Sequence, residues 1–170
     1  MGCGLFVLIL RTATRDDVPG VEALLQRSYP RLLKADYAPS VLVTALPLIS
    51  RAQPRLVACG TYYVIEDEGA VVAAGGWTAV PPQGHGRIEG VAHVRHVATD
   101  PDRTRAGLGR HLMEHIVAAA RAAGHTRMDS QSTLTAVPFY RAMGFTEIGP
   151  IEIELRPGIV FPAMAMTRRI

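Results

Sequence analysis

The sequence predicts an α/β fold in which helices cover both faces of a mixed β-sheet. Segments with the two-residue alternation of strands are interleaved along the chain with segments whose apolar residues recur at helical spacing. Around residues 91–124 the two kinds follow one another directly, as a strand, a tight glycine-containing turn and a helix. Because no repeat, low-complexity tract or linker interrupts the 170 residues, we expect one domain over residues 1–170.

The N-terminal third is expected to hold one strand and two helices. The strand is predicted over residues 5–14 and leads into the acidic pair Asp16-Asp17, which favours a helix start. Apolar spacing then predicts a first helix that ends at Pro30, and a second helix over residues 39–50. Pro47 predicts a kink or an early end of the second helix, because proline removes a helix hydrogen bond.

The middle of the chain predicts a hairpin and then a strand–turn–helix unit. Residues 61–79 contain two alternating runs around the turn Asp67-Glu68-Gly69, which indicates a β-hairpin. Residues 91–99 alternate as a strand does, and Leu108 opens a helical pattern that Gly124 ends.

The C-terminal part predicts a short strand, a short helix and a final pair of strands. The short strand is expected over residues 127–131 and the helix over residues 135–143. Residues 145–155 and 160–167 are expected to pair antiparallel around the turn Pro157-Gly158.

The turn before the helix at Leu108 has the features of an anion-binding site. Gly107 and Gly109 carry no Cβ, so their backbone N–H groups are open to a ligand, and the helix start adds unpaired donors and a positive dipole end. Arg103, Arg105 and Arg110 add positive side chains. The turn lacks the lysine of a P-loop and the third glycine of the dinucleotide fingerprint. It therefore predicts a pyrophosphate cradle of another kind.

Two stretches resemble the motifs of the GNAT superfamily of N-acetyltransferases. Thr104-Arg105-Ala106-Gly107-Leu108-Gly109 resembles motif A, although the family usually has glutamine or arginine where Thr104 stands. Residues 132–145, in which Phe139-Tyr140 precede Gly144-Phe145, resemble motif B. The resemblance covers residues 64–168 well and implies a GNAT-type fold with a mixed, mostly antiparallel central sheet of about seven strands.

The resemblance also implies an activity and a cosubstrate. It implies an acetyl-CoA-dependent N-acetyltransferase in which a primary amine attacks directly within a ternary complex, without a metal. The pantetheine arm of acetyl-CoA would pair with the central strand like an added strand. Matched position by position, the residues implied to bind acetyl-CoA are Val97, Ala98, Thr99, Thr104, Arg105, Ala106, Gly107, Leu108, Gly109, Arg110 and Thr135.

Tyr140 is implied to be the general acid, because the family's motif B tyrosine lies near the sulfur and can protonate the leaving thiolate. For the general base, His93 stands where several family members carry a glutamate, and Glu89 is the alternative carboxylate. Strict alternation would place His93, Arg95, Val97 and Thr99 on one face of the strand, whereas a β-bulge would invert this order.

Two other functions are compatible with the sequence. The first is a non-catalytic acyl-CoA-binding or interaction module, since a fold does not guarantee chemistry. The second is a zinc hydrolase, because His111, Glu114 and His115 fit a zinc-peptidase helix pattern. The two histidines would bind the metal, but no third zinc ligand is obvious.

Composition bounds the compartment and the partners. The net charge is +3 with dispersed basic residues, so a nucleic-acid surface is not indicated. Cys3 and Cys59 do not form a disulfide framework, which favours a cytoplasmic protein. The apolar start of the chain is shorter than a signal peptide usually needs, and no segment is long enough to cross a membrane. The acceptor is an unidentified amine, and a homodimer stays an open alternative.

Residues of the acceptor site carry no readable pattern. Tyr37, Trp77 and His85 are candidates, but a core tryptophan and a loop histidine are the commoner roles of such residues.

Overall fold

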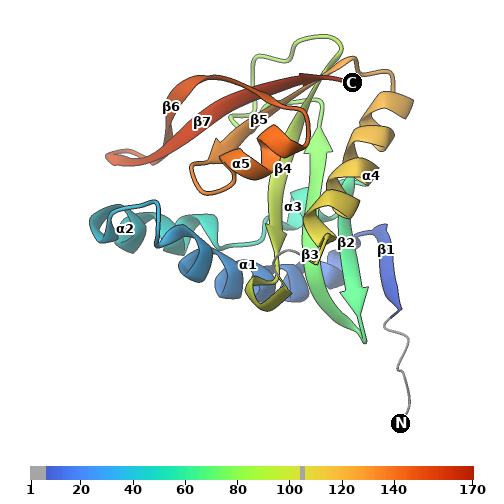
Figure 1. The fold of residues 1–170 in the computed structure, drawn as a ribbon, viewed down its shortest axis with the longest axis horizontal. Coiled ribbons are helices and arrows are strands. Elements are labelled where there is room, and N and C mark those ends of the chain that lie inside the picture. The colour runs from blue at the N-terminus through green and yellow to red at the C-terminus, as the bar shows by residue number, and fades with distance from the viewer. Residues whose placement is uncertain (1–6, 104–105) are drawn as a thin grey trace.

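The strands form one seven-stranded sheet in a computed structural model that describes residues 7–103 and 106–170. The strands are β1 (Leu8–Thr12), β2 (Tyr62–Asp67), β3 (Ala70–Thr78), β4 (Val91–Thr99), β5 (Arg127–Thr133), β6 (Thr146–Arg156) and β7 (Ile159–Arg169). Their order is β1-β2-β3-β4-β5-β7-β6 (Figure 1). The pair β4–β5 is parallel and the other five pairs are antiparallel, which confirms the mixed, mostly antiparallel sheet.

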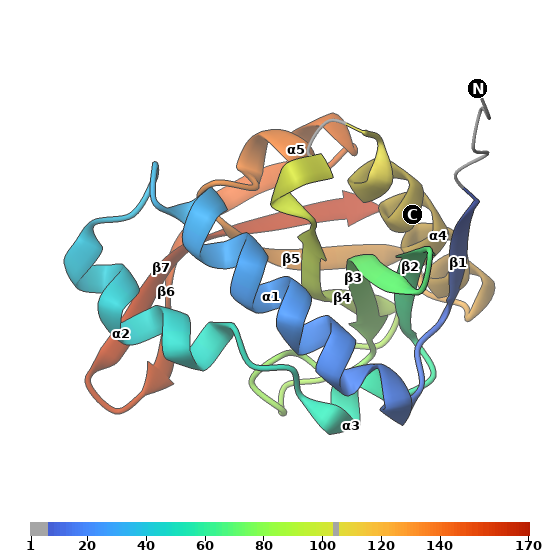
Figure 2. The same ribbon diagram turned by 90° about the horizontal axis from the view of Figure 1, so that it is seen from below.

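Helices lie on both faces of this sheet, as predicted. They are α1 (Val18–Leu33), α2 (Pro39–Ile49), α3 (Pro54–Val57), α4 (Leu108–Ala122) and α5 (Val137–Ala142), with short 3-10 turns η1 (Arg15–Asp17) and η2 (Pro101–Arg103). Viewed from below, α1 and α2 cross in front of the strands, and α4 lies behind them (Figure 2). None of the described helices is long and apolar enough to cross a membrane.

Each face has its own apolar core, which explains why the two helix layers form. On the α4 face, the buried helix positions Leu112, Met113 and Ile116 pack with Ile65 and Met128 of the sheet. On the α1 face, the residues that pack together include Val21, Leu24 and Leu25 of the helix and Val64 and Ala98 of the sheet. Burial of such side chains is the main favourable term in folding, at about 25 cal/mol per Å² of apolar surface.

Two prolines lie inside helices without ending them. The prediction that α1 ends at Pro30 is wrong, because the helix continues to Leu33. Leu33 is only 2% exposed and packs against Tyr37 and Phe161. So close to the helix end the proline removes one backbone hydrogen bond, and burial of the next turn outweighs this loss. The helix predicted over residues 39–50 is confirmed as α2, which continues past Pro47 to Ile49, so the alternative of an early end at this proline is wrong.

A β-bulge in β4 changes the faces of its last residues. Ala74 of β3 pairs with Ala98, but Gly76 pairs with Arg95, so two β4 residues lie opposite one β3 residue. Within this bulge His96 has a φ of +45°. The strict alternation expected over His93, Arg95, Val97 and Thr99 is therefore wrong after Arg95, because the extra residue turns Val97 toward the α4 core and Ala98 toward the α1 core.

The central strands β4 and β5 are paired at one end only. Their parallel pairing joins residues 91–93 of β4 to residues 127–129 of β5. Both strands continue beyond these pairs, to Thr99 and Thr133 respectively. The edge of β4 beyond His93 therefore has no strand partner on the β5 side within the described residues.

Candidate functional site

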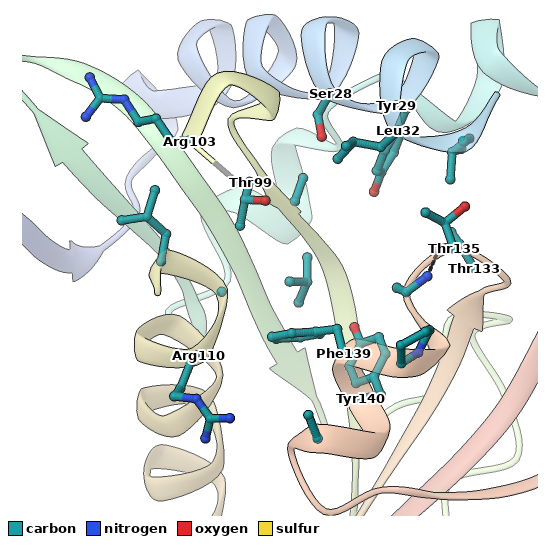
Figure 3. Close-up of a pocket in the computed structure, with 18 of the residues that line it drawn as sticks. Ser28, Tyr29, Leu32, Thr99, Arg103, Arg110, Thr133, Thr135, Phe139 and Tyr140 are labelled. Atoms are coloured by element: carbon teal, nitrogen blue, oxygen red, sulfur yellow. Dashed lines mark hydrogen bonds between the residues drawn. The ribbon is translucent and has the colours of Figure 1, made fainter. Parts of the chain in front are cut away.

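A cavity of about 880 Å³ lies where β4 and β5 part. Figure 3 shows it between the C-terminal half of α1 on one side and the start of α4 with α5 on the other. Its lining residues are Ser28, Tyr29, Leu32, Leu33, Val97, Ala98, Thr99, Arg103, Gly107, Leu108, Gly109, Arg110, Thr133, Thr135, Ala136, Pro138, Phe139, Tyr140 and Ala142.

Most residues that the sequence assigns to cofactor binding meet in this cavity. Val97, Ala98 and Thr99 reach it from β4, Gly107–Arg110 from the start of α4, and Thr135 from the turn before α5. Ala106 is exposed beside the start of α4 but is not part of the lining. Thr104 and Arg105 lie outside the described residues.

The start of α4 presents bare backbone to the cavity. Gly107 is the N-cap residue and has a φ of +78°, a conformation that glycine adopts without strain. Among the described residues no atom would lie within 4 Å of a Cβ at Gly107, so on their side the space beside this glycine is open to a ligand. A Cβ at Gly109 would lie 3.1 Å from the ring of Phe139, so this glycine lets the ring pack against the helix start. The buried Leu108 anchors the turn between them.

Two arginines line the cavity at this end. Arg103 forms an ion pair with the buried carboxylate of Asp67. Arg110 is exposed, and its guanidinium lies 3.9 Å from the carboxylate of Glu114, one turn further along α4. Among the described acids, Glu114 is the only ion-pair partner of Arg110, and it is distant. The charge of Arg110 therefore remains available to an anion at the helix start.

Tyr140 is a buried phenol whose oxygen points into the cavity (Figure 3). Its ring is 6% exposed and packs edge-to-face against Phe139 and Phe145. Burial raises the pKa of Tyr140 to about 12, although the nearby Ser130 side chain lowers it. Tyr29 points its oxygen toward the same space from α1, and burial together with Tyr140 raises the pKa of Tyr29 (Figure 3).

His93 lines a second, smaller cavity of about 200 Å³. Its Nε2 atom is buried and has no hydrogen-bond partner within the described part of the chain. Burial lowers the pKa of His93 below its usual value, and the carboxylate of Asp129 opposes this shift. Ser130 lines the same small cavity, and its side chain lowers the pKa of Tyr140. Ser130 therefore lies between His93 and Tyr140.

Glu89, the alternative base, lies apart from both cavities. It is exposed in the turn before β4 and lines neither of them. The large cavity begins at the other end of this strand, so the geometry gives Glu89 no support as a base.

The zinc-peptidase pattern has other contacts in the structure. His115 packs edge-to-face on Tyr63, with ring centroids 4.5 Å apart, and Glu114 faces Arg110. Across residues 7–103 and 106–170, no three histidine, cysteine, aspartate or glutamate side chains are grouped so that they could hold a metal ion.

The three acceptor-site candidates lie in different places. The Tyr37 hydroxyl donates to the Pro162 carbonyl oxygen at 2.7 Å and accepts from the Leu134 N–H at 2.8 Å. Trp77 is buried in the α4 core, and His85 is exposed in the loop after β3. None of the three lines the large cavity.

The side of the cavity that α1 forms was not predicted from the sequence. Ser28, Tyr29, Leu32 and Leu33 line the cavity about seventy residues before the β4 residues that they face. Their helical spacing is the same as that of core residues, so no local signal distinguishes them.

Comparison with known proteins identifies the family. The model of the acetyltransferase (GNAT) domain matches residues 58–147, which is more than half of the chain. No curated protein sequence matches the chain significantly.

Many solved structures share the fold. The PaiA N-acetyltransferase from Thermoplasma acidophilum, in complex with coenzyme A, has a TM-score of 0.72 at 10% identity, over 96% of this chain and 99% of that chain. A GCN5-related N-acetyltransferase from Rhodopseudomonas palustris has a TM-score of 0.76 at 16% identity, over 99% and 100%.

A third neighbour is a longer chain, of which only a part matches. It is the N-acetylglutamate synthase from Neisseria gonorrhoeae complexed with coenzyme A and N-acetyl-glutamate, with a TM-score of 0.62 at 18% identity, over 96% of this chain and 35% of that chain. At these identities the likenesses show the fold, and the domain model shows the family. This chain is a member of the GNAT family of acetyltransferases.

Proposed function

We propose that the chain transfers the acetyl group of acetyl-CoA to a primary amine by direct attack in a ternary complex. The observation that carries the proposal is the large cavity, in which a glycine-based helix start, an unpaired strand edge and a buried phenol meet. Each of these three features matches one chemical need of acetyl transfer.

The lining residues fit acetyl-CoA along the length of the cavity. The open backbone at Gly107 and the charge of Arg110 suit a pyrophosphate at the start of α4. The unpaired edge of β4 at Val97–Thr99 suits amide groups that hydrogen-bond like a strand. When bound, acetyl-CoA supplies the activated acetyl thioester.

Two side chains are proposed to move the protons. His93 accepts the amine proton at its unpartnered Nε2, directly or through a water molecule. Because burial lowers the pKa of His93, the ring is neutral and able to accept a proton near pH 7. Tyr140 donates its phenol proton to the departing sulfur, and its raised pKa keeps that proton in place until then.

The experiment that tests the proposal is an acetylation screen with a panel of primary amines, followed by release of the free thiol of CoA. Turnover of at least one amine with stoichiometric thiol release would support it. Binding of acetyl-CoA without turnover of any amine would contradict it and favour a non-catalytic acyl-CoA-binding module.

Substitution of His93 by alanine is expected to lower kcat/KM by roughly a hundredfold, with the largest loss at low pH. The reason is that His93, with its lowered pKa, accepts protons until the pH falls through that pKa, whereas solvent and hydroxide replace it at high pH. A pH profile of kcat/KM for both proteins measures this difference, and the affinity for acetyl-CoA should not change.

A second variant, Asp129→Asn, sharpens the assignment of the base. Because the Asp129 carboxylate raises the pKa of His93, its removal is expected to move the acidic limb of the profile to lower pH. An unchanged limb in Asp129→Asn and an unchanged profile in His93→Ala would remove His93 from the mechanism.

A further inference from the structure

Arg95 differs from the other half-buried arginines in its partners. Arg11 and Arg103 form ion pairs with carboxylates, and Arg168 donates to a backbone carbonyl oxygen at 2.7 Å. Arg95 donates one hydrogen bond, from Nη1 to the Thr78 hydroxyl at 3.1 Å. Among the described residues it has no ion pair with an acid.

A half-buried guanidinium without an anion beside it lowers the stability of the folded chain. Burial lowers the pKa of Arg95, and the opposing effects come from Cys59 and Tyr62 rather than from a carboxylate. Arginine nevertheless stays charged in proteins, so the folded chain holds a partly desolvated positive charge. Such uncompensated groups are frequent in functional sites, because a ligand supplies the missing partner.

Arg95 lies on the same face of β4 as the proposed base. Thr78, which accepts the hydrogen bond from Arg95, is the residue of β3 that pairs with His93. Both β4 residues precede the bulge, so their side chains point to the same side, about 7 Å apart along the strand. A small molecule whose amine lies near His93 therefore has Arg95 within a few bond lengths.

The carboxylate of Asp129, on the neighbouring strand, has other partners than Arg95. Asp129, the strand partner of His93, accepts hydrogen bonds from Arg127 at 3.0 and 2.9 Å and from the Thr167 hydroxyl at 2.7 Å. Asp129 therefore leaves the positive charge of Arg95 without an ion pair among the described residues.

From these contacts we infer that Arg95 binds a carboxylate of the acceptor, and that the acceptor is a primary amine with a carboxylate a few bonds from its nitrogen. A guanidinium binds a carboxylate through two parallel N–H···O bonds, which also orients the amine toward His93. This inference rests on the proposed function, because it concerns the acceptor of the same reaction.

The test compares amino acids with their carboxamides, which have nearly the same size but no negative charge. For wild-type protein, kcat/KM is expected to be higher for the acids. The Arg95→Gln variant is expected to lose roughly 10–100-fold in kcat/KM for the acids, mainly through KM, and little for the amides. Aminoalkyl phosphonates form a third arm, and a preference for them over carboxylates would overturn the choice of a carboxylate.

Further variants separate recognition from folding. Arg95→Lys keeps the charge and is expected to retain part of the preference for acids, whereas Arg95→Glu is expected to favour diamines over acids. Arg87→Gln is the matched control, because Arg87 is exposed in the loop between β3 and β4, and its preference should equal that of wild type. Melting temperatures show whether each variant folds.

Binding of the N-acetylated acids and amides, measured by calorimetry, gives the same comparison without turnover. Equal use of acids and amides by wild type, or an equal loss for both in Arg95→Gln, would overturn the inference while leaving acetyl transfer intact. Failure to acetylate any amine would instead contradict the proposed function itself.

Discussion

Replacing Tyr140 with phenylalanine is expected to lower kcat by roughly 10²–10⁴-fold and to leave the affinity for acetyl-CoA near normal. The substitution keeps the ring, which packs between Phe139 and Phe145, and removes only the hydroxyl that points into the cavity. Because burial raises the pKa of Tyr140 to about 12, the phenol is protonated at neutral pH and can donate directly. Steady-state kinetics and calorimetry measure the two quantities.

Tyr29→Phe is the matched control for this experiment. Tyr29 also points its hydroxyl into the cavity, but from the opposite wall on α1 (Figure 3). We expect removal of the Tyr29 hydroxyl to lower kcat much less, because no motif or contact gives this hydroxyl a role in proton transfer. A similar loss in both variants would mean that the cavity needs polar groups in general, and full activity in Tyr140→Phe would leave water as the proton source.

The features that sequence predicts well are local ones. The helix start at Leu108 and the bare backbone of Gly107 before it depend on residues within one turn of that position. For the same reason the hairpin at residues 61–79 and the final strand pair were predictable, since their turns contain the glycines that such turns require.

The features that sequence does not reveal depend on distant partners. The bulge at His96 exists because β3 and β4 pair with one residue more on β4, and alternation within β4 alone cannot show this. The bulge matters for the site, because it places the side chain of Val97 on the face of β4 opposite to His93 and Arg95. The α1 wall of the cavity depends in the same way on how a helix packs across the sheet, and Tyr29 has the spacing of an ordinary core residue.

Gly107 combines two properties that a substitution can separate. Its φ of +78° disfavours residues with a side chain, at about 1–2 kcal/mol for most of them. Its missing Cβ also leaves open space beside the helix start, where no atom of the described residues would lie within 4 Å of a Cβ. The first property concerns stability and the second concerns the approach of a ligand, and asparagine tolerates the left-handed conformation better than other residues do.

The Gly107→Asn variant is therefore expected to fold normally and to lose at least about a hundredfold in affinity for acetyl-CoA, equivalent to about 2.8 kcal/mol. The new side chain would fill the space in which the backbone meets the pyrophosphate. Gly124→Asn is the matched control, because Gly124 follows the other end of α4, has a φ of +93° and also has no atom within 4 Å of a Cβ. Calorimetric titration with acetyl-CoA measures both affinities, and thermal melting measures both stabilities. If Gly107→Asn bound acetyl-CoA as tightly as Gly124→Asn does, the pyrophosphate would have to bind away from the start of α4.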